Sequence, residues 1–174
     1  MDNSYNSYNS YNLLYILIIV VVLIHCYESS KTRIKAEHFT NININTPSLK
    51  NYRFELVLVD TPKKMETGLM YRSKPLYERQ HIIQGMLFDY KKMGKRSMWM
   101  KNTIIPLDMI FMDNNMRVVG IIKNAAPYST TSRTIENVAR YVLELNGNTS
   151  SRLGLSIGDT ISSDKITLIN ELVN

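Results

Sequence analysis

Residues 109–122 read MIFMDNNMRVVGII, and this stretch indicates the fold class of the chain. Two apolar runs, 109–112 and 116–122, are joined by Asp113, Asn114 and Asn115, which are residue types that favour tight turns. Short apolar runs joined in this way predict a β-hairpin. We therefore expect two antiparallel strands here and a β-rich domain built around them.

Five more short runs on either side of this hairpin have the character of strands. They comprise residues 52–60, 85–88, 97–100, 139–145 and 160–169. The first of them alternates, which places Phe54, Leu56 and Leu58 on one predicted face. Residues 89–96 are polar and contain Gly94, so they are predicted to form a hairpin tip between the second and third runs.

Two short helices are predicted among these strands. Thr61 followed by Pro62 is typical of a helix start, and this helix is expected to run to about residue 70. Asn148 is expected to cap a second helix that runs through Leu153 and ends at Gly154. Short strands, frequent turns and two short helices predict an α+β fold that is mostly β, in a small compact barrel-like or sandwich-like domain.

Three segments precede this globular domain, which is expected over residues 51–174. Residues 1–12 repeat Asn, Ser and Tyr and have little apolar surface to bury, so they are expected to form a disordered, low-complexity arm. Residues 13–27 are almost wholly apolar and are expected to be a membrane anchor or a signal segment. Residues 28–50 are rich in polar residues and are expected to act as a linker.

The role of the hydrophobic segment stays open at this level. The span from Tyr11 to Tyr27 is close to the lower limit of about 17 residues for a membrane-spanning helix, and tyrosine at both edges fits a membrane belt. A cleaved secretory signal or a buried soluble segment are the alternatives. Lys31, Arg33 and Lys35 favour a cytosolic position for the domain, whereas a signal anchor would place it on the opposite side. We expect a membrane-associated chain with a single-pass anchor, or an exported one, rather than a soluble cytosolic protein.

Composition excludes several kinds of site. The one cysteine, Cys26, lies inside the hydrophobic segment, which excludes an intramolecular disulfide and a cysteine-based zinc site. His81 is the only histidine in the predicted domain. No metal or cofactor is therefore expected. The formal charge of +6 permits an acidic partner, but no recognition helix, zinc finger or RNA-binding motif points to nucleic acid.

Lys101, Asn102, Thr103 and Asp108 form a polar cluster between apolar stretches. In a ligand site Lys101 and Asn102 would donate hydrogen bonds, and Asp108 would accept them or act as a base. The alternative is a structural turn at Pro106, in which the polar side chains satisfy backbone groups. Both interpretations remain open at the level of sequence.

Two acidic residues stand between apolar neighbours. A charged Asp108 is costly to bury without a partner, and Arg72, Lys101 and Arg140 are the partners that the sequence offers. Glu144 could form a carboxylate pair with Asp108, as in hydrolysis of glycosides or other substrates. The alternative for Glu144 is an exposed or ion-paired strand residue.

Lys91, Lys92, Lys95 and Arg96 form a basic run on the predicted hairpin tip. This run could bind the head groups of acidic lipids or an acidic protein, or it could be a solvated tip.

Trp99 is the only tryptophan, and with Met98 and Met100 it could form the floor of a pocket or pack in the core. Tyr128 begins a loop, residues 128–134, that is rich in hydroxyl groups. This loop could line the same pocket, or it could be a plain exposed loop.

Residues 99–108, WMKNTIIPLD, resemble the signature of domain-of-unknown-function family 192, also called uncharacterised protein family 0127. Residues 60–62 (DTP), 68–72 (GLMYR), 85–88 (GMLF) and 139–145 (ARYVLEL) are similar to other parts of the family, in the same order. The resemblance covers about residues 52–162 and departs from the family by a longer insertion at 77–84 and a tail beyond 163. It implies a compact, mostly β domain, often found behind a signal or an anchor, and it implies no activity.

These observations predict a small membrane-tethered or exported module that binds a ligand or acts as an accessory rather than a catalyst. Its expected ligand-binding residues are Arg72, Lys101, Asn102, Thr103, Asp108 and Tyr128. One alternative is a small hydrolase that uses Asp108 and Glu144. Another is a scaffold that binds acidic lipid or protein through the basic run.

Overall fold

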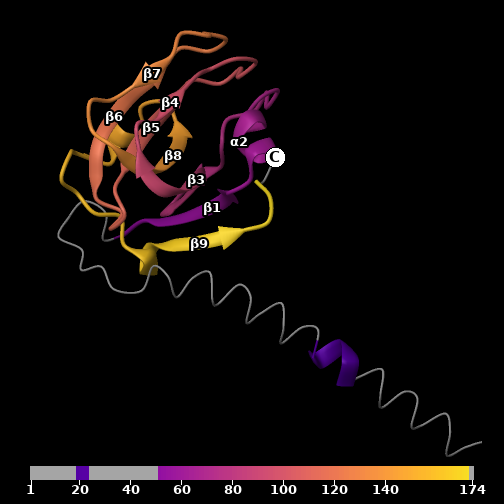
Figure 1. Ribbon diagram of the computed structural model, residues 1–174. Helices are drawn as coiled ribbons and strands as arrows, with labels where there is room; N and C mark the ends of the chain where they lie inside the picture. Colours follow the sequence, from indigo (N-terminus) through magenta and orange to yellow (C-terminus); the bar gives the residue numbers. More distant parts are fainter. Residues whose placement is uncertain (1–18, 24–50, 173–174) are drawn as a thin grey trace, which may run out of the picture. The chain divides into compact units, whose positions relative to one another are not determined.

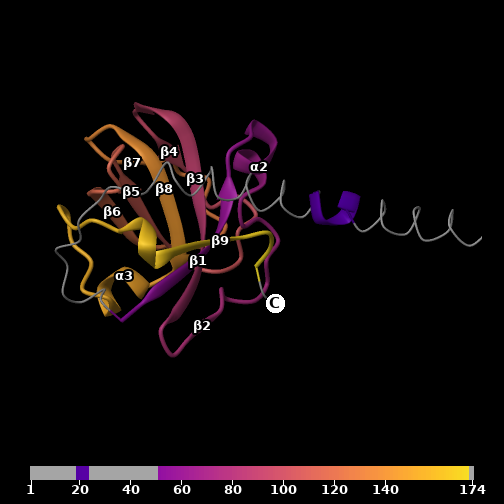
Figure 2. The ribbon, with the colours of Figure 1, turned by 90° about the horizontal axis from the view of Figure 1, so that it is seen from below.

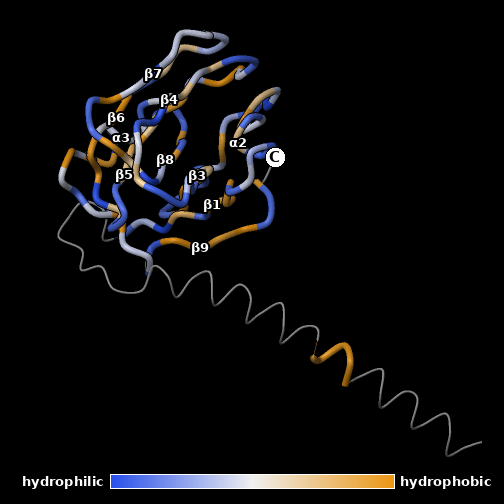
Figure 3. The backbone as a smooth tube through the Cα atoms, in the orientation of Figure 1, coloured by the Kyte–Doolittle hydropathy of each residue, from blue (hydrophilic) through white to orange (hydrophobic). Residues whose placement is uncertain are grey.

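The computed structural model describes residues 19–23 and 51–172. The chain divides into two units, Met1–Thr40 and Asn41–Asn174, and each is treated by itself. In the first unit, residues 19–23 are helical and exposed, and Figure 3 shows them as hydrophobic throughout. The predicted arm, the linker and most of the hydrophobic segment lie outside the described residues. Among the described residues, no helix is both long enough and apolar enough to cross a membrane.

The second unit is built on a mixed seven-stranded sheet that is not closed into a barrel (Figure 1). Six strands follow the order β6-β5-β8-β3-β1-β9, and β2 pairs with β3 off this path. A separate two-stranded sheet joins β4 and β7. The strands are β1 (Arg53–Val59), β2 (Glu78–Arg79), β3 (Ile82–Gly94), β4 (Ser97–Met98), β5 (Leu107–Met112), β6 (Val118–Ala125), β7 (Arg133–Thr134), β8 (Ala139–Asn146) and β9 (Ile166–Ile169). The helices are α2 (Pro62–Thr67), α3 (Thr149–Arg152) and the 3-10 turn η2 (Ser163–Lys165).

The predicted fold class is confirmed, because the domain is mostly β and sandwich-like with short helices. The hairpin at 109–122 forms as antiparallel β5 and β6, with Ile110 opposite Ile121. β8 confirms the strand expected at 139–145 and pairs antiparallel with both β5 and β3, so it lies at the centre of the sheet. Helix α2 begins at Pro62, and Lys64 N donates to Oγ1 of Thr61 over 3.4 Å.

Parallel pairing of β1 with β3 was not anticipated from the sequence. The register places Leu56 opposite Gly85, and β9 is also parallel to β1. Parallel strands need a crossover connection, and α2 lies within it. Gly85 is required at this point, since a Cβ there would lie 2.8 Å from the carbonyl oxygen of Glu144 and 2.7 Å from a methyl group of Leu145.

The prediction of a hairpin tip at residues 89–96 is wrong. β3 continues through this stretch to Gly94, which pairs with Ala139 of β8, and β4 pairs with β7 instead of β3. The polar residues misled the prediction because β3 extends beyond the buried part of the sheet: Asp89 is buried, whereas Lys91 and Lys92 are exposed. The final strand is also shorter than expected, because η2 precedes β9.

Helix α3 lies where it was predicted, but a different residue caps it. Asn148 makes no capping bond with its side chain. The carboxylate of Asp108, on β5, accepts from N of Asn148 over 3.0 Å, from N of Ser150 over 2.7 Å and from Oγ of Ser150 over 2.6 Å. It also accepts from N of Asn124 over 2.7 Å. A single buried side chain thus joins β5, the end of β6 and the start of α3. Figure 2 labels these three elements in the ribbon.

The two faces of the large sheet bury different sets of side chains. One face contributes Met86, Phe88, Met109 and Val142 to a core cluster that also contains Leu69 next to α2, Met98 of β4 and Met100. We call this face of the sheet the α2 face. The opposite face carries Asp108, and α3 packs against β5 and β8 on that side. The small sheet and α2 therefore cover one face, and α3 covers part of the other.

Replacement of Asp108 by Asn is expected to destabilise the domain strongly. An amide cannot accept all four hydrogen bonds, and its NH2 group would face buried N–H donors. We expect the melting temperature of the full chain, measured by circular dichroism at pH 7, to fall by about 10 °C. Asp113→Asn, at the exposed β5–β6 turn, is the matched control and should cost much less. An unchanged or higher melting temperature for Asp108→Asn would contradict the structural role.

Candidate functional site

Asp108 and Glu144 do not form a carboxylate pair. In the register of β5 with β8, Asp108 lies opposite Leu145, and Met109 lies opposite Glu144. Directly paired residues share a face, whereas neighbours along a strand point to opposite faces. The two carboxylates therefore lie on opposite sides of the sheet. The partners of Asp108 are backbone N–H groups and Ser150, not the cations expected from the sequence, and Arg140 instead pairs with Asp89 over 3.1 Å.

Glu144 lies on the α2 face, and it is the most unusual polar group of the described domain. Its side chain is 4% exposed, and its strand neighbours are Met86 and Met109. Within the described residues, Oε2 of Glu144 is buried and has no hydrogen-bond partner. Burial raises the pKa of the Glu144 carboxyl from 4.5 to about 8. At pH 7 the group is therefore mainly a neutral carboxylic acid.

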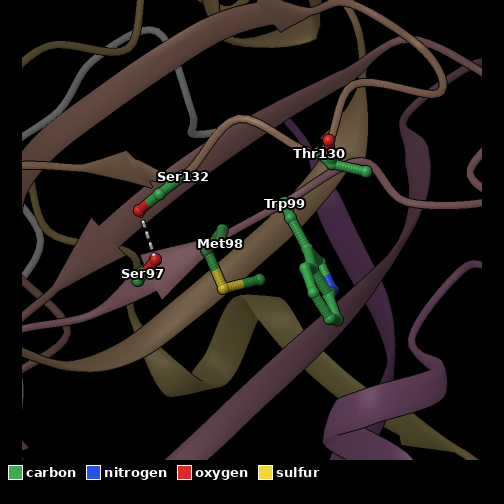
Figure 4. Close-up of a pocket in the computed structure, with 5 residues that line it drawn as sticks. All are labelled: Ser97, Met98, Trp99, Thr130 and Ser132. Carbon is green, nitrogen blue, oxygen red and sulfur yellow. Dashed lines mark hydrogen bonds between the residues drawn. The ribbon is translucent and has the colours of Figure 1, made fainter.

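A cavity of about 300 Å³ opens where β4 meets the loop before β7 (Figure 4). It is lined by Ser97, Met98, Trp99, Thr130 and Ser132. Oγ of Ser97 and Oγ of Ser132 lie 2.7 Å apart and share a hydrogen bond, while the indole of Trp99 extends along the cavity. The hypothesis that Trp99, Met98 and the 128–134 loop line one pocket agrees with this geometry, but Met100 is fully buried in the core.

Trp99 is 43% exposed although it is the largest side chain of the domain. The ammonium group of Lys101 lies 5.2 Å from the centre of its ring, a distance typical of a cation–π contact. The indole thus has solvent access and a cation beside it. Beneath the cavity, Sδ of Met98 accepts a hydrogen bond of 3.3 Å from the hydroxyl of Tyr90, which connects the cavity to the α2 face.

Asn102, Thr103 and Tyr128 shape the rim beside the cavity rather than its lining. Nδ2 of Asn102 donates to the hydroxyl of Tyr71 over 2.9 Å, and its carbonyl accepts from N of Tyr71 over 2.8 Å. N of Tyr128 donates to the carbonyl of Thr103 over 3.0 Å. Tyr71, Asn102 and Tyr128 all have φ between 54° and 64°, a left-handed conformation that side chains rarely adopt. The rim is therefore held in a costly and specific backbone geometry.

Arg72 follows this rim, partly buried, and desolvation lowers the pKa of its guanidinium. It follows Tyr71, whose backbone N donates to the carbonyl of Asn102, so Arg72 and Asn102 lie on neighbouring segments. Asp108 lies apart from both, on the opposite face of the sheet. Of the predicted cluster, Lys101, Asn102 and Thr103 stay together in one loop. Asp108 belongs to the opposite face.

Most of the basic run is held by contacts within the domain. Lys91 pairs with Asp89 over 3.0 Å and with Asp60 over 3.7 Å. Nζ of Lys95 donates to the carbonyl of Glu136. Nε of Arg96 donates to the carbonyl of Ala139 over 2.9 Å, and its guanidinium lies 4.3 Å from the centre of a tyrosine ring. The run is therefore not a hairpin of free cations.

Two residues of the site carry no signal in the sequence. Tyr71 and Ser97 are common surface types, and only a left-handed backbone or a tertiary position distinguishes them, whereas Thr130 and Ser132 belong to the hydroxyl-rich loop 128–134. Glu144 was noticed, because an acidic residue inside an apolar strand is unusual. Among the described residues, no group of three or more His, Cys, Asp or Glu side chains could hold a metal ion.

Replacement of Glu144 by Gln is expected to stabilise the domain at neutral and alkaline pH. Because the pKa of Glu144 is about 8 in the folded state, the free energy of unfolding is highest below about pH 4.5, where this group is neutral in both states. It falls as pH rises towards 8, because the unfolded chain then ionises more readily than the folded one. Gln stays neutral throughout. We expect the melting temperature of Glu144→Gln to exceed that of the wild type by several degrees at pH 8 and by little at pH 5.

Glu66→Gln, on the exposed side of α2, is the control and should follow the pH trend of the wild type. A difference between Glu144→Gln and wild type that stays constant from pH 5 to pH 8 would show that Glu144 does not titrate in this range.

The comparisons with known proteins cover most of this domain. A search of curated proteins found no match. A crystal structure from Sinorhizobium meliloti, described as a "putative transcription regulator", is 40% identical, with a TM-score of 0.55, over 60% of this chain and 78% of that one. A protein of unknown function from Novosphingobium aromaticivorans is 36% identical, with a TM-score of 0.54, over 63% of this chain and 73% of that one.

The family model DUF192, described as "Uncharacterized ACR, COG1430", matches residues 44–163. These residues span all strands of the domain except β9, and they include both Glu144 and the cavity at Trp99. The match covers more than half of the chain and agrees with the resemblance seen in residues 99–108. The chain belongs to the DUF192 family.

Proposed function

We propose that the domain is a binding module for a small ring-shaped molecule that carries an acidic group. The observation that carries this proposal is the half-exposed Trp99 in a cavity whose other walls present three hydroxyl groups. Ligand sites typically combine an apolar or aromatic surface with a few placed polar groups, in cavities of about 300 Å³ or more. The cavity has both features, and its volume lies at the lower end of this range.

The roles of the lining residues follow from their chemistry. The indole of Trp99 offers a flat surface on which a ring stacks. Ser97, Thr130 and Ser132 each donate or accept a hydrogen bond, so they fix the orientation of polar groups on the ring. Lys101, 5.2 Å from the indole centre, provides a cation for an acidic group. The strained rim formed by Tyr71, Asn102 and Tyr128 holds the lysine-bearing loop in place.

The geometry favours binding over hydrolysis. A two-carboxylate mechanism needs both groups on one side of the substrate-binding face, within about 10 Å of each other. Asp108 and Glu144 are on opposite faces, and Asp108 already accepts four hydrogen bonds from its own domain. The neighbours of Glu144 on β3 and β5 are Met86 and Met109, so neither of these strands places a second carboxylate directly beside it.

Polyanion binding is also less well supported than a small ligand. Binding to a nucleic acid or to acidic lipid needs cations that are free to approach phosphates. Lys91, Lys95 and Arg96 are instead engaged by acidic groups and carbonyls of the domain. We therefore do not extend the proposal to either partner.

Trp99 provides its own assay, because it is the only tryptophan of the chain. We expect benzoate and phenyl phosphate to change its fluorescence in a saturable way, and benzyl alcohol and benzylammonium to act far more weakly. Lys101→Gln should weaken benzoate binding about tenfold, and Thr130→Val about fivefold, the effect of one hydrogen bond. Lys123→Gln, an exposed lysine on β6, is the matched control and should bind as the wild type does.

Two results would refute the proposal. The first is the absence of a saturable response to all four probes. The second is an equal affinity for benzoate in Lys101→Gln and Lys123→Gln.

We further propose that residues 13–27 tether this module to a membrane. The support is compositional: an uncharged apolar run bounded by tyrosines, of which residues 19–23 are helical. On alkaline carbonate extraction of membranes, the full chain should stay with the pellet, and a variant with Lys at positions 18 and 21 should be released. Recovery of the full chain in the supernatant would exclude an anchor and leave export or a soluble chain.

A further inference from the structure

Three exposed aromatic side chains lie on neighbouring segments at and beside the cavity. Tyr71 is 70% exposed, Tyr128 is 63% exposed and Trp99 is 43% exposed. They are three of the four exposed aromatic side chains of the described domain, and Tyr77 is the fourth. We call these three residues the aromatic surface. Large side chains left in solvent forgo the stabilisation that burial would give, so their gathering in one place indicates a binding surface.

The segments that carry the aromatic surface are joined by hydrogen bonds of the domain. N of Tyr71 donates to the carbonyl of Asn102 over 2.8 Å, and the hydroxyl of Tyr71 accepts from Nδ2 of Asn102 over 2.9 Å. N of Tyr128 donates to the carbonyl of Thr103 over 3.0 Å. Asn102 and Thr103 belong to the loop that follows Trp99. The aromatic surface is therefore preorganised, and a ligand pays little to order it.

The polar groups of the cavity favour a sugar ring over an aromatic acid. Ser97, Thr130 and Ser132 line the cavity, and each hydroxyl can donate and accept a hydrogen bond. An aromatic acid offers such a wall only its carboxylate. A sugar ring carries hydroxyl groups around its edge and C–H groups on its faces, so it matches the hydroxyl-lined wall and the flat indole of Trp99 at the same time.

The charge of these segments favours an anion. Residues 70–74, 97–103 and 128–134 contain no Asp or Glu, and they contain four basic residues: Arg72, Lys74, Lys101 and Arg133. Lys74 and Lys101 are exposed, and Lys101 lies 5.2 Å from the centre of the Trp99 ring. Charge of one sign attracts a ligand of the opposite sign and disfavours a neutral one of the same shape.

We propose that the cavity and the aromatic surface bind an acidic oligosaccharide, a chain of sugar rings that carry carboxylates. One uronic acid unit lies against the indole of Trp99 with its carboxylate towards Lys101. Neighbouring units stack on the rings of Tyr71 and Tyr128. This inference rests on the proposed function, since it names the ligand class of the same cavity and extends the site beyond it.

An acidic lipid surface suits this geometry less well. Aromatic residues at a bilayer interface place their apolar ring towards the lipid and their polar group towards water. The indole of Trp99 instead extends along the cavity, as Figure 4 shows, and the hydroxyl of Tyr71 is bonded to Asn102. A chain of rings can enter a cavity that a flat lipid surface cannot fill.

The test compares galacturonate with trigalacturonate, which links three such units, on the full chain. The fluorescence of Trp99, the only tryptophan, gives the dissociation constants. Maltotriose has the length and the hydroxyl groups of the trimer but no carboxylate. Tyr71→Asn and Tyr128→Asn remove a ring without adding backbone strain, because Asn tolerates the left-handed conformation of both positions. Tyr77→Asn is the matched control.

We expect trigalacturonate to bind the wild type about twentyfold more tightly than galacturonate, and maltotriose to give no saturable response. Tyr71→Asn and Tyr128→Asn should each lower this ratio of trimer to monomer affinity about fivefold, the effect of one stacked ring. Tyr77→Asn should keep the ratio of the wild type. The ratio is the readout because it cancels any change in the cavity itself.

The failure of this proposal can be told apart from failure of the proposed function. If benzoate binds but trigalacturonate binds no more tightly than galacturonate, the oligosaccharide is excluded and the small-ligand cavity stands. If benzoate does not bind, both proposals fail. The oligosaccharide is also excluded if maltotriose binds as tightly as trigalacturonate, if Tyr77→Asn lowers the ratio as much as Tyr71→Asn, or if phosphatidylglycerol vesicles bind in its place.

Discussion

The carboxylate of Asp108 is the interaction on which the rest of the domain depends. From β5, next to the edge strand β6, it accepts hydrogen bonds from Asn124, Asn148 and Ser150, which belong to the end of β6 and the start of α3. Both asparagines have a left-handed backbone, with φ of 49° and 70°, so the bonds to Asp108 offset a conformational cost. Because β5 also pairs with β6 and β8, these bonds hold the end of β6 and the start of α3 against the same strand.

The same register determines what each face of the sheet can do. Because Asp108 lies on the α3 side, the next residue of β5, Met109, lies on the α2 side, and so does its partner across the sheet, Glu144. One acid is thereby fully satisfied and structural, and the other is buried without a described partner. The two carboxylates, close in the sheet, have opposite roles because a β-strand alternates its side chains. This is why a pair that looked catalytic in the sequence cannot act as one.

We expect function at residues whose backbone conformation, exposure or burial is unfavourable for folding. The rim residues Tyr71, Asn102 and Tyr128 adopt left-handed backbone conformations, Trp99 is left half exposed, and Glu144 is buried with a raised pKa. All belong to the α2 side or to the loops at the small sheet of β4 and β7. By contrast, the α3 side has a saturated polar network. Costs of this kind tend to persist at binding sites, where a ligand offsets them.

The sequence by itself determined the hairpin at 109–122, the start of α2, the strand at 139–145, the mostly β class and the family, because these depend on local patterns of apolar residues, turns and caps. It also singled out Asp108, Glu144 and Trp99 as unusual. Only the tertiary structure decided that β1 and β3 are parallel, that β3 runs through the polar residues 89–94, and that Asp108 and Glu144 face apart. Strand pairing joins residues that are far apart in the chain, and its register, which no local pattern encodes, assigns each side chain to a face.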